Sequence, residues 1–60
     1  MRIGVDNTRG EEAFTLRVDR DTRGEHTVVV FAAGESKGVT VKLADLRAAL
    51  EWCSRRAGVA

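Results

Sequence analysis

The sequence predicts an α+β fold in which a four-stranded antiparallel sheet is followed by one C-terminal helix. Two patterns indicate this fold. Short segments of alternating or β-branched residues, typical of strands, are separated by glycine-containing turns. From Leu43 the spacing of apolar residues becomes that of an amphipathic helix. With only 60 residues, the chain is expected to form a single domain over residues 1–60.

The first two strands are expected at Arg2 to Asp6 and at Ala13 to Arg20. In the first, Ile3 and Val5 share one face, as in a half-buried strand. The second alternates between an inner set, Phe14, Leu16 and Val18, and an outer set, Thr15, Arg17 and Asp19. Between the strands lies Asn7 to Gly10, whose turn-forming residues predict a tight connection.

The third strand is expected at Thr27 to Phe31, after a type I or short bulged turn at Asp21 to Gly24. Its residues are apolar on both faces, which is typical of a central strand or of one whose outer face meets a second subunit. Ala33 to Gly38 is expected to be a flexible loop, and it lacks the residue spacing of a phosphate-binding loop. Val39 to Val41 is expected to form the fourth strand.

The helix is expected to begin near Leu43, directly after the fourth strand, and Lys42 stands where a capping side chain would be expected. At about 100° per residue, one apolar stripe is expected to pack on the sheet; its members are Leu43, Leu46, Leu50, Cys53 and Ala57. Cys53 is therefore expected to be buried and without a nucleophilic role. Gly58 ends the helix, and Val59 and Ala60 are expected to be a fraying tail.

A chain of this length buries only about 60% of the surface that its unfolded form exposes, so it needs additional stabilisation. One cysteine and one histidine exclude an internal disulfide and a four-ligand metal site, which leaves self-association. The expected homodimer interface contains Ala48, Ala49 and Trp52, because Trp52 points more than about 100° away from the centre of the stripe. The alternatives are that Trp52 packs on its own sheet edge or is exposed.

Ten basic and nine acidic residues give a net charge of +1, so any basic site must be local. No apolar run suits a membrane span or a signal peptide, and a cytoplasmic protein without membrane contact is expected. His26 is expected at the surface, and the serines and glutamates show no spacing of a catalytic triad or carboxylate pair. We therefore expect no enzyme, no catalytic residue, no cofactor and no metal. The chain contains no proline, and no internal repeat is expected.

If all four strands pair in one sheet, polar residues share its open face: Arg2, Thr15, Arg17, Thr40 and Lys42. The functional interpretation is a shallow surface that follows a phosphate backbone. The alternative is an ordinary solvated sheet face, interrupted by Asp6 and Asp19. Basic loop residues would extend the surface, and the full set predicted to bind nucleic acid is Arg9, Arg17, Arg20, Arg23, Lys37 and Lys42.

Three segments carry a resemblance to a known family: Ile3-Gly4-Val5 with Arg9-Gly10, Phe14-Thr15-Leu16-Arg17, and Lys37-Gly38-Val39-Thr40-Val41 with Leu46 behind it. In these the chain resembles the positive-cofactor-four family of transcriptional coactivators and their bacterial relatives, which are small dimers that bind single-stranded DNA. The resemblance implies the same fold, a dimer, and DNA contacts by Arg9, Arg17 and Lys37.

The chain departs from the family pattern at two aromatic positions, where it has Thr8 and Arg20, and in a longer connection from Arg17 to Lys37. A stacking aromatic contributes about 1–3 kcal/mol per base, so binding would depend on phosphate contacts and be sensitive to salt.

The sequence thus predicts a non-enzymatic, homodimeric module that binds nucleic acid, most simply single-stranded DNA, in transcription regulation or DNA maintenance. The alternative is a small protein-interaction factor, such as an antitoxin, an anti-defence protein or a phage-encoded inhibitor, that acts on a protein partner. The near-neutral charge and the missing aromatics favour the alternative, whereas the Lys37-to-Leu46 match and the basic loops favour nucleic acid.

Overall fold

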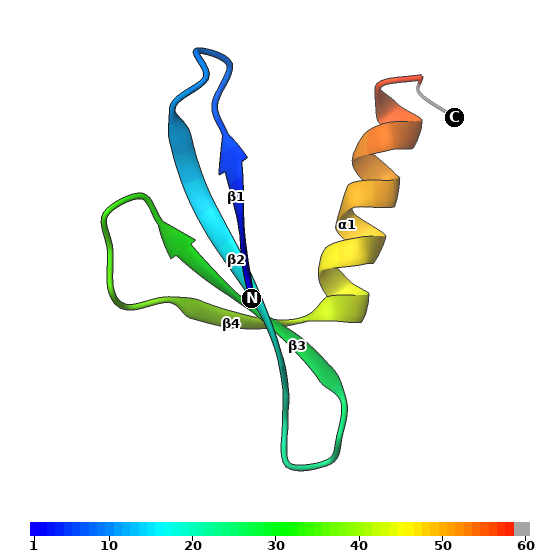
Figure 1. Cartoon of the computed structure of the whole chain (residues 1–60). Helices are drawn as coiled ribbons and strands as arrows, with labels where there is room; N and C mark the ends of the chain where they lie inside the picture. Colours follow the sequence, from blue (N-terminus) through cyan, green and yellow to red (C-terminus); the bar gives the residue numbers. More distant parts are fainter. Residues whose placement is uncertain (59–60) are drawn as a thin grey trace.

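The computed structural model describes residues 1–58, which form four strands and one helix (Figure 1). The elements are β1 (Arg2–Asp6), β2 (Glu12–Arg20), β3 (His26–Ala32), β4 (Val39–Lys42) and α1 (Leu43–Arg56). The strands pair antiparallel in chain order, β1-β2-β3-β4, so β1 and β4 are the edges. The predicted fold class is confirmed. Val59 and Ala60, predicted to be a fraying tail, lie outside the described residues.

The two tight hairpins are built in the same way. In each, an Asn or Asp side chain accepts hydrogen bonds from two backbone N–H groups: Asn7 Oδ1 from Arg9 and Glu11, and Asp21 Oδ1 from Arg23 and Glu25. A glycine with φ near +80° follows in both, at Gly10 and Gly24. The underlying sequences, NTRGE and DTRGE, are a five-residue recurrence, so the expectation of no internal repeat was wrong at this scale.

Strand register gives the sheet two different faces. Cross-strand partners share a face, and the pairs Ile3–Leu16, Leu16–Val30 and Val30–Val39 place one apolar row toward α1. The pairs Arg2–Arg17, Arg17–Val29 and Val29–Thr40 place a mixed row on the opposite, outer face. The alternation predicted for the strands is therefore confirmed.

The buried core lies on β3 and extends to both faces of the sheet. Val28 is 2% exposed on the helix side, and Val29 and Phe31 are 7% and 5% exposed on the outer side. Flanked by β2 and β4, β3 is a central strand, as its apolar composition predicted.

Gly38, just before β4, lies directly over the outer-face core. A Cβ atom at this position would stand 2.6 Å from Val29 Cγ1, 2.9 Å from the Val30 carbonyl oxygen and 3.0 Å from Phe31 Cδ1. These distances leave no room for a side chain, so glycine is required for the chain to cover Phe31 on its way into β4.

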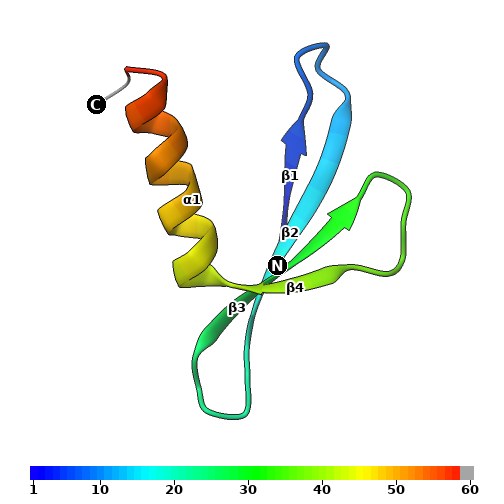
Figure 2. The same ribbon diagram turned by 180° about the vertical axis from the view of Figure 1, so that it is seen from behind.

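The helix α1 follows β4 without a linker and then leaves the sheet. Lys42 is its N-cap and makes no side-chain capping hydrogen bond, as its residue type predicted. The helix and the β1–β2 hairpin diverge from this junction as two separate arms (Figures 1 and 2). No residue of Leu43–Arg56 is buried.

This divergence corrects the predicted extent of the helix–sheet contact. Leu43, Leu46 and Leu50 face the sheet, but Cys53 and Ala57 are exposed, so the expected burial of Cys53 was wrong. The residues share a stripe as the periodicity indicates. The stripe meets the sheet only near the start of the helix, because the axis tilts away from it.

Replacing Gly38 with alanine tests the close approach over Phe31. We expect Gly38→Ala to lower the free energy of unfolding by about 1–3 kcal/mol, because Val29 and the Val30 carbonyl must move. The matched control is Gly4→Ala in β1, whose Cβ would meet only Glu12 Oε1 at 3.4 Å and is expected to change stability by less than about 1 kcal/mol. Urea unfolding measures both, and equal stability of the two variants would contradict the packing.

Candidate binding surfaces

The outer face of the sheet carries two arginines in direct cross-strand register. Arg2 of β1 and Arg17 of β2 are paired residues, and both guanidinium groups lie over the ring of Phe31, at 4.2 and 5.4 Å from its centroid. Like charges directly opposite one another destabilise a sheet. The negative face of the Phe31 ring offsets part of this repulsion.

The carboxylate of Asp19 also offsets part of the repulsion between the two arginines. The Nε and Nη2 atoms of Arg17 donate to Asp19 Oδ2 at 3.1 and 2.9 Å. Both side chains are about 40% exposed, so solvent screens the pair and its contribution is about 0.2–1 kcal/mol. Because this carboxylate balances one arginine of the two, the centre of the outer face keeps a positive charge.

The polar residues predicted to share this face do so. Lys42 pairs with Thr27, and Thr15 pairs with Phe31, which places both on the side of Arg2 and Arg17. At the far end of the β1–β2 pair, Asp6 and Glu12 oppose each other beyond a register shift. The basic part of the face is therefore confined to the central rows and the β4–α1 junction.

The structure does not gather the six residues predicted to bind nucleic acid. Arg17 and Lys42 share the outer face, but Arg20 lies on the helix-side face, where its Nε donates to His26 Nε2 at 3.3 Å. Arg9 and Arg23 sit in hairpins at opposite ends of the sheet, and Lys37 is in the β3–β4 loop (Figure 1). Arg2, which is outside the predicted set, is the direct neighbour of Arg17, a relation that only the register reveals.

Phe31 does not offer a free stacking platform. It is 5% exposed, beneath the two arginines and beside Gly38. A base could stack on this ring only after the guanidinium groups moved. The outer face therefore presents charge and hydrogen-bond donors in place of aromatic surface.

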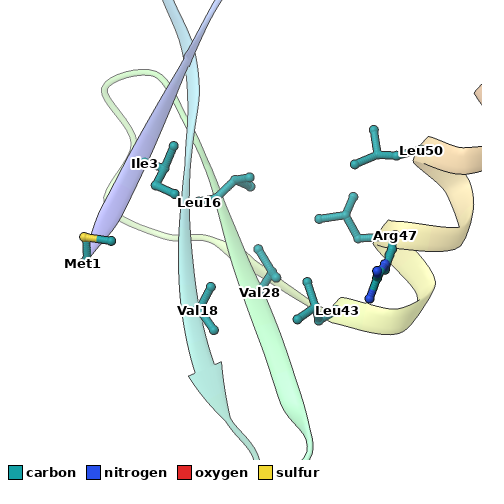
Figure 3. A pocket seen from close by; sticks show the side chains of 9 residues that line it. Met1, Ile3, Leu16, Val18, Val28, Leu43, Arg47 and Leu50 are labelled. Carbon is teal, nitrogen blue, oxygen red and sulfur yellow. The ribbon is translucent and has the colours of Figure 1, made fainter. Parts of the chain in front are cut away.

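The second surface is an apolar groove between α1 and the helix-side face of the sheet (Figure 3). It encloses about 490 Å³, and eight of its nine lining residues are apolar. Leu43, Leu46 and Leu50 line the helix wall together with Arg47; the sheet wall is made by Met1, Ile3, Leu16, Val18 and Val28. An adjoining hollow of about 340 Å³ reaches Val5, Phe14 and Val30.

Trp52 lies on α1 and is 54% exposed. The guanidinium of Arg56, one turn along, stands 4.8 Å from its ring centroid. Ala48 and Ala49 are also exposed. Trp52 is therefore exposed in the single chain. The predicted homodimer contact would bury it.

Within residues 1–58, no group of three or more His, Cys, Asp or Glu side chains is arranged so that it could hold a metal ion. No helix among these residues is both long and apolar enough to cross a membrane. Searches of protein-family models, of curated proteins and of solved structures find no match to this chain.

The stacking of arginine on Phe31 can be measured by a double-mutant cycle. We expect Arg2→Gln and Phe31→Leu to couple by about 0.5–1 kcal/mol in the free energy of unfolding, because either change removes the cation–π contact. Phe14→Leu is the control partner for Arg2→Gln, since Phe14 lies on the opposite face and should give no coupling. Equal coupling in the two cycles would exclude a specific contact.

Proposed function

We propose that the chain is a non-enzymatic, homodimeric module of the cytoplasm that binds single-stranded nucleic acid, most simply DNA, through the outer face of its sheet. The observation that carries this proposal is the pair Arg2 and Arg17, held in cross-strand register over Phe31, of which only Arg17 has a carboxylate partner, Asp19. The role that follows is transcription regulation or DNA maintenance, as the family resemblance implies.

A phosphate group suits this pair for electrostatic and geometric reasons. Two guanidinium groups on neighbouring strands repel each other, and a bound anion would remove that repulsion. The planar donors of arginine also match phosphate oxygens in a bidentate geometry. Lys42 lies on the same face and provides a further positive charge near the junction with α1.

The shape of the face favours a single strand over a duplex. Sequence-specific duplex binding commonly inserts a helix or a two-stranded ribbon into the major groove, whereas an open sheet face can support an extended strand. Because Phe31 is covered, affinity would come from phosphate contacts with little base stacking. Binding should then be weak, tolerant of sequence and strongly dependent on salt.

A protein-interaction factor is the second candidate, and the exposed apolar groove favours it. A surface lined by eight apolar residues is typical of a protein contact. The two functions differ in what accompanies the purified protein: nucleic acid raises the ratio of absorbance at 260 nm to that at 280 nm, and a protein partner is recovered in a pull-down.

Titration of a fluorescent single-stranded oligonucleotide tests the nucleic-acid function. We expect binding at low salt, and the double variant Arg2→Gln/Arg17→Gln to reduce the slope of log K against log salt by about 1.4, since each lost phosphate contact changes it by about 0.7. The control Arg55→Gln/Arg56→Gln removes the same charge from the end of α1. Anisotropy measures both variants.

Two results would overturn the proposal. Absence of binding by the unmodified protein at low salt would exclude nucleic acid as the ligand. Equal weakening by the outer-face and the helix variants would show that net charge, and not the Arg2–Arg17 pair, determines the affinity.

A further inference from the structure

The isolated chain exposes more surface than a compact protein of its size. Its accessible area is 5131 Å², whereas a folded monomer of 6.5 kDa is expected to expose about 3,800 Å². Its radius of gyration is 13.0 Å, against about 10.4 Å for a compact chain of this length. The excess area is therefore about 1,300 Å² per chain.

Part of this excess lies at the apolar groove between α1 and the sheet. Ile3 and Val18 on the sheet wall are 56% and 54% exposed, and Leu50 on the helix wall is 59% exposed (Figure 3). These side chains face a common space without filling it. The two walls thus resemble a hydrophobic core that is opened along one side.

The helix extends this apolar surface beyond the groove. At about 100° per residue, Cys53 lies next to Leu46 on the surface of α1, and Ala49 and then Trp52 lie progressively farther from Leu46 in the same direction. All three are exposed. The charge of Arg47 at the rim is partly balanced by Glu51, whose Oε1 lies 3.9 Å from Arg47 Nε. The apolar surface of the groove therefore continues around α1 to Cys53 and Ala49, and Trp52, with the guanidinium of Arg56 over its ring, lies at its margin.

The size of the excess indicates what covers it. A standard interface buries about 800 Å² per partner, and obligate homodimers bury about 2,000–5,000 Å² in total, with the composition of a core cut in half. Two chains that each bury about 1,300 Å² would bury about 2,600 Å² together, which is within that range. Because both walls of the groove belong to every copy, two copies can meet around a two-fold axis with the same residues on each side.

We propose that the groove between α1 and the helix-side face of the sheet is the interface with a second copy of this chain, and that the two open half-cores join into one. The inference rests on the homodimer of the proposed function and assigns its surface: Ile3, Leu50 and Cys53 lie within the contact and Trp52 at its margin. The outer faces, with Arg2 and Arg17, then point away from the interface in both copies.

Sedimentation equilibrium of the unmodified chain and of two wall variants tests the proposal. We expect a dimer, and we expect Ile3→Glu on the sheet and Leu50→Glu on the helix each to raise the dimer dissociation constant more than about tenfold, because each places a charge in an apolar contact. The control Ser36→Glu puts the same charge in the exposed β3–β4 loop, which does not line the groove, and should leave the dimer intact. An unmodified chain that stays monomeric at every concentration, or equal effects of all three variants, would overturn it.

Cys53 gives a second readout that needs no variant. Its thiol is exposed in the single chain, so a thiol reagent such as Ellman's reagent should react quickly at low protein concentration and at least about tenfold more slowly once the dimer forms. A dimer in which Cys53 reacts as quickly as in the monomer would place the interface elsewhere. The reactivity of Cys53 in the unmodified chain tests the position of the interface even if Ile3→Glu or Leu50→Glu prevents folding.

The dimer and the nucleic-acid function fail separately. A monomer that binds the oligonucleotide would overturn the dimer alone, and a dimer with protected Cys53 that binds no oligonucleotide would overturn the nucleic-acid function alone. If the chain is a monomer and Cys53 becomes protected only when another protein is bound, the groove is the binding site of that protein. This result would overturn the proposal.

Discussion

Pairing of β3 with both β2 and β4 is the interaction on which the rest of the structure depends. It buries Val28 toward α1 and Val29 with Phe31 toward the outer face, and these are the apolar residues of the described chain that are buried most completely. On the outer side, Phe31 gives Arg2 and Arg17 a common surface on which to lie. On the inner side, Val28 forms the floor of the groove. Both candidate binding surfaces are thus built on one strand.

Periodicity in the sequence predicted the strands, their faces and the helical stripe, because these depend on local spacing. It did not predict how far the stripe stays on the sheet. That distance depends on the angle at which α1 leaves β4, so Cys53 was assigned to a core that ends near Leu50. That Arg2 lies opposite Arg17 depends on the register between β1 and β2. Alternation within each strand does not determine that register. The recurrence of NTRGE and DTRGE, by contrast, was readable in the sequence and corresponds to two hairpins of the same construction.

The two faces of the sheet divide the proposed roles. The outer face holds its charges in fixed positions through Phe31 and Asp19, so an incoming phosphate would meet arginines that are already oriented. The inner face forms one wall of the apolar groove, whose lining includes a single charged residue, Arg47 of α1, with Glu51 Oε1 3.9 Å from its Nε. In the proposal, Arg2 and Arg17 serve binding, and Ile3 and Leu50 serve assembly, so substitutions at the two sets are expected to change the two functions separately.

The order of the strands also has a kinetic consequence. Each strand pairs with its neighbour in the chain, and the two tight hairpins each close over five residues, so the sheet requires no pairing between distant segments. Sheets with such local contacts form quickly compared with those that wait for long-range pairing. A newly made chain would accordingly complete its sheet before it meets a second copy. If the proposed dimer forms, the first folded species would be a monomer with an open groove, and its lifetime would depend on the concentration of the protein.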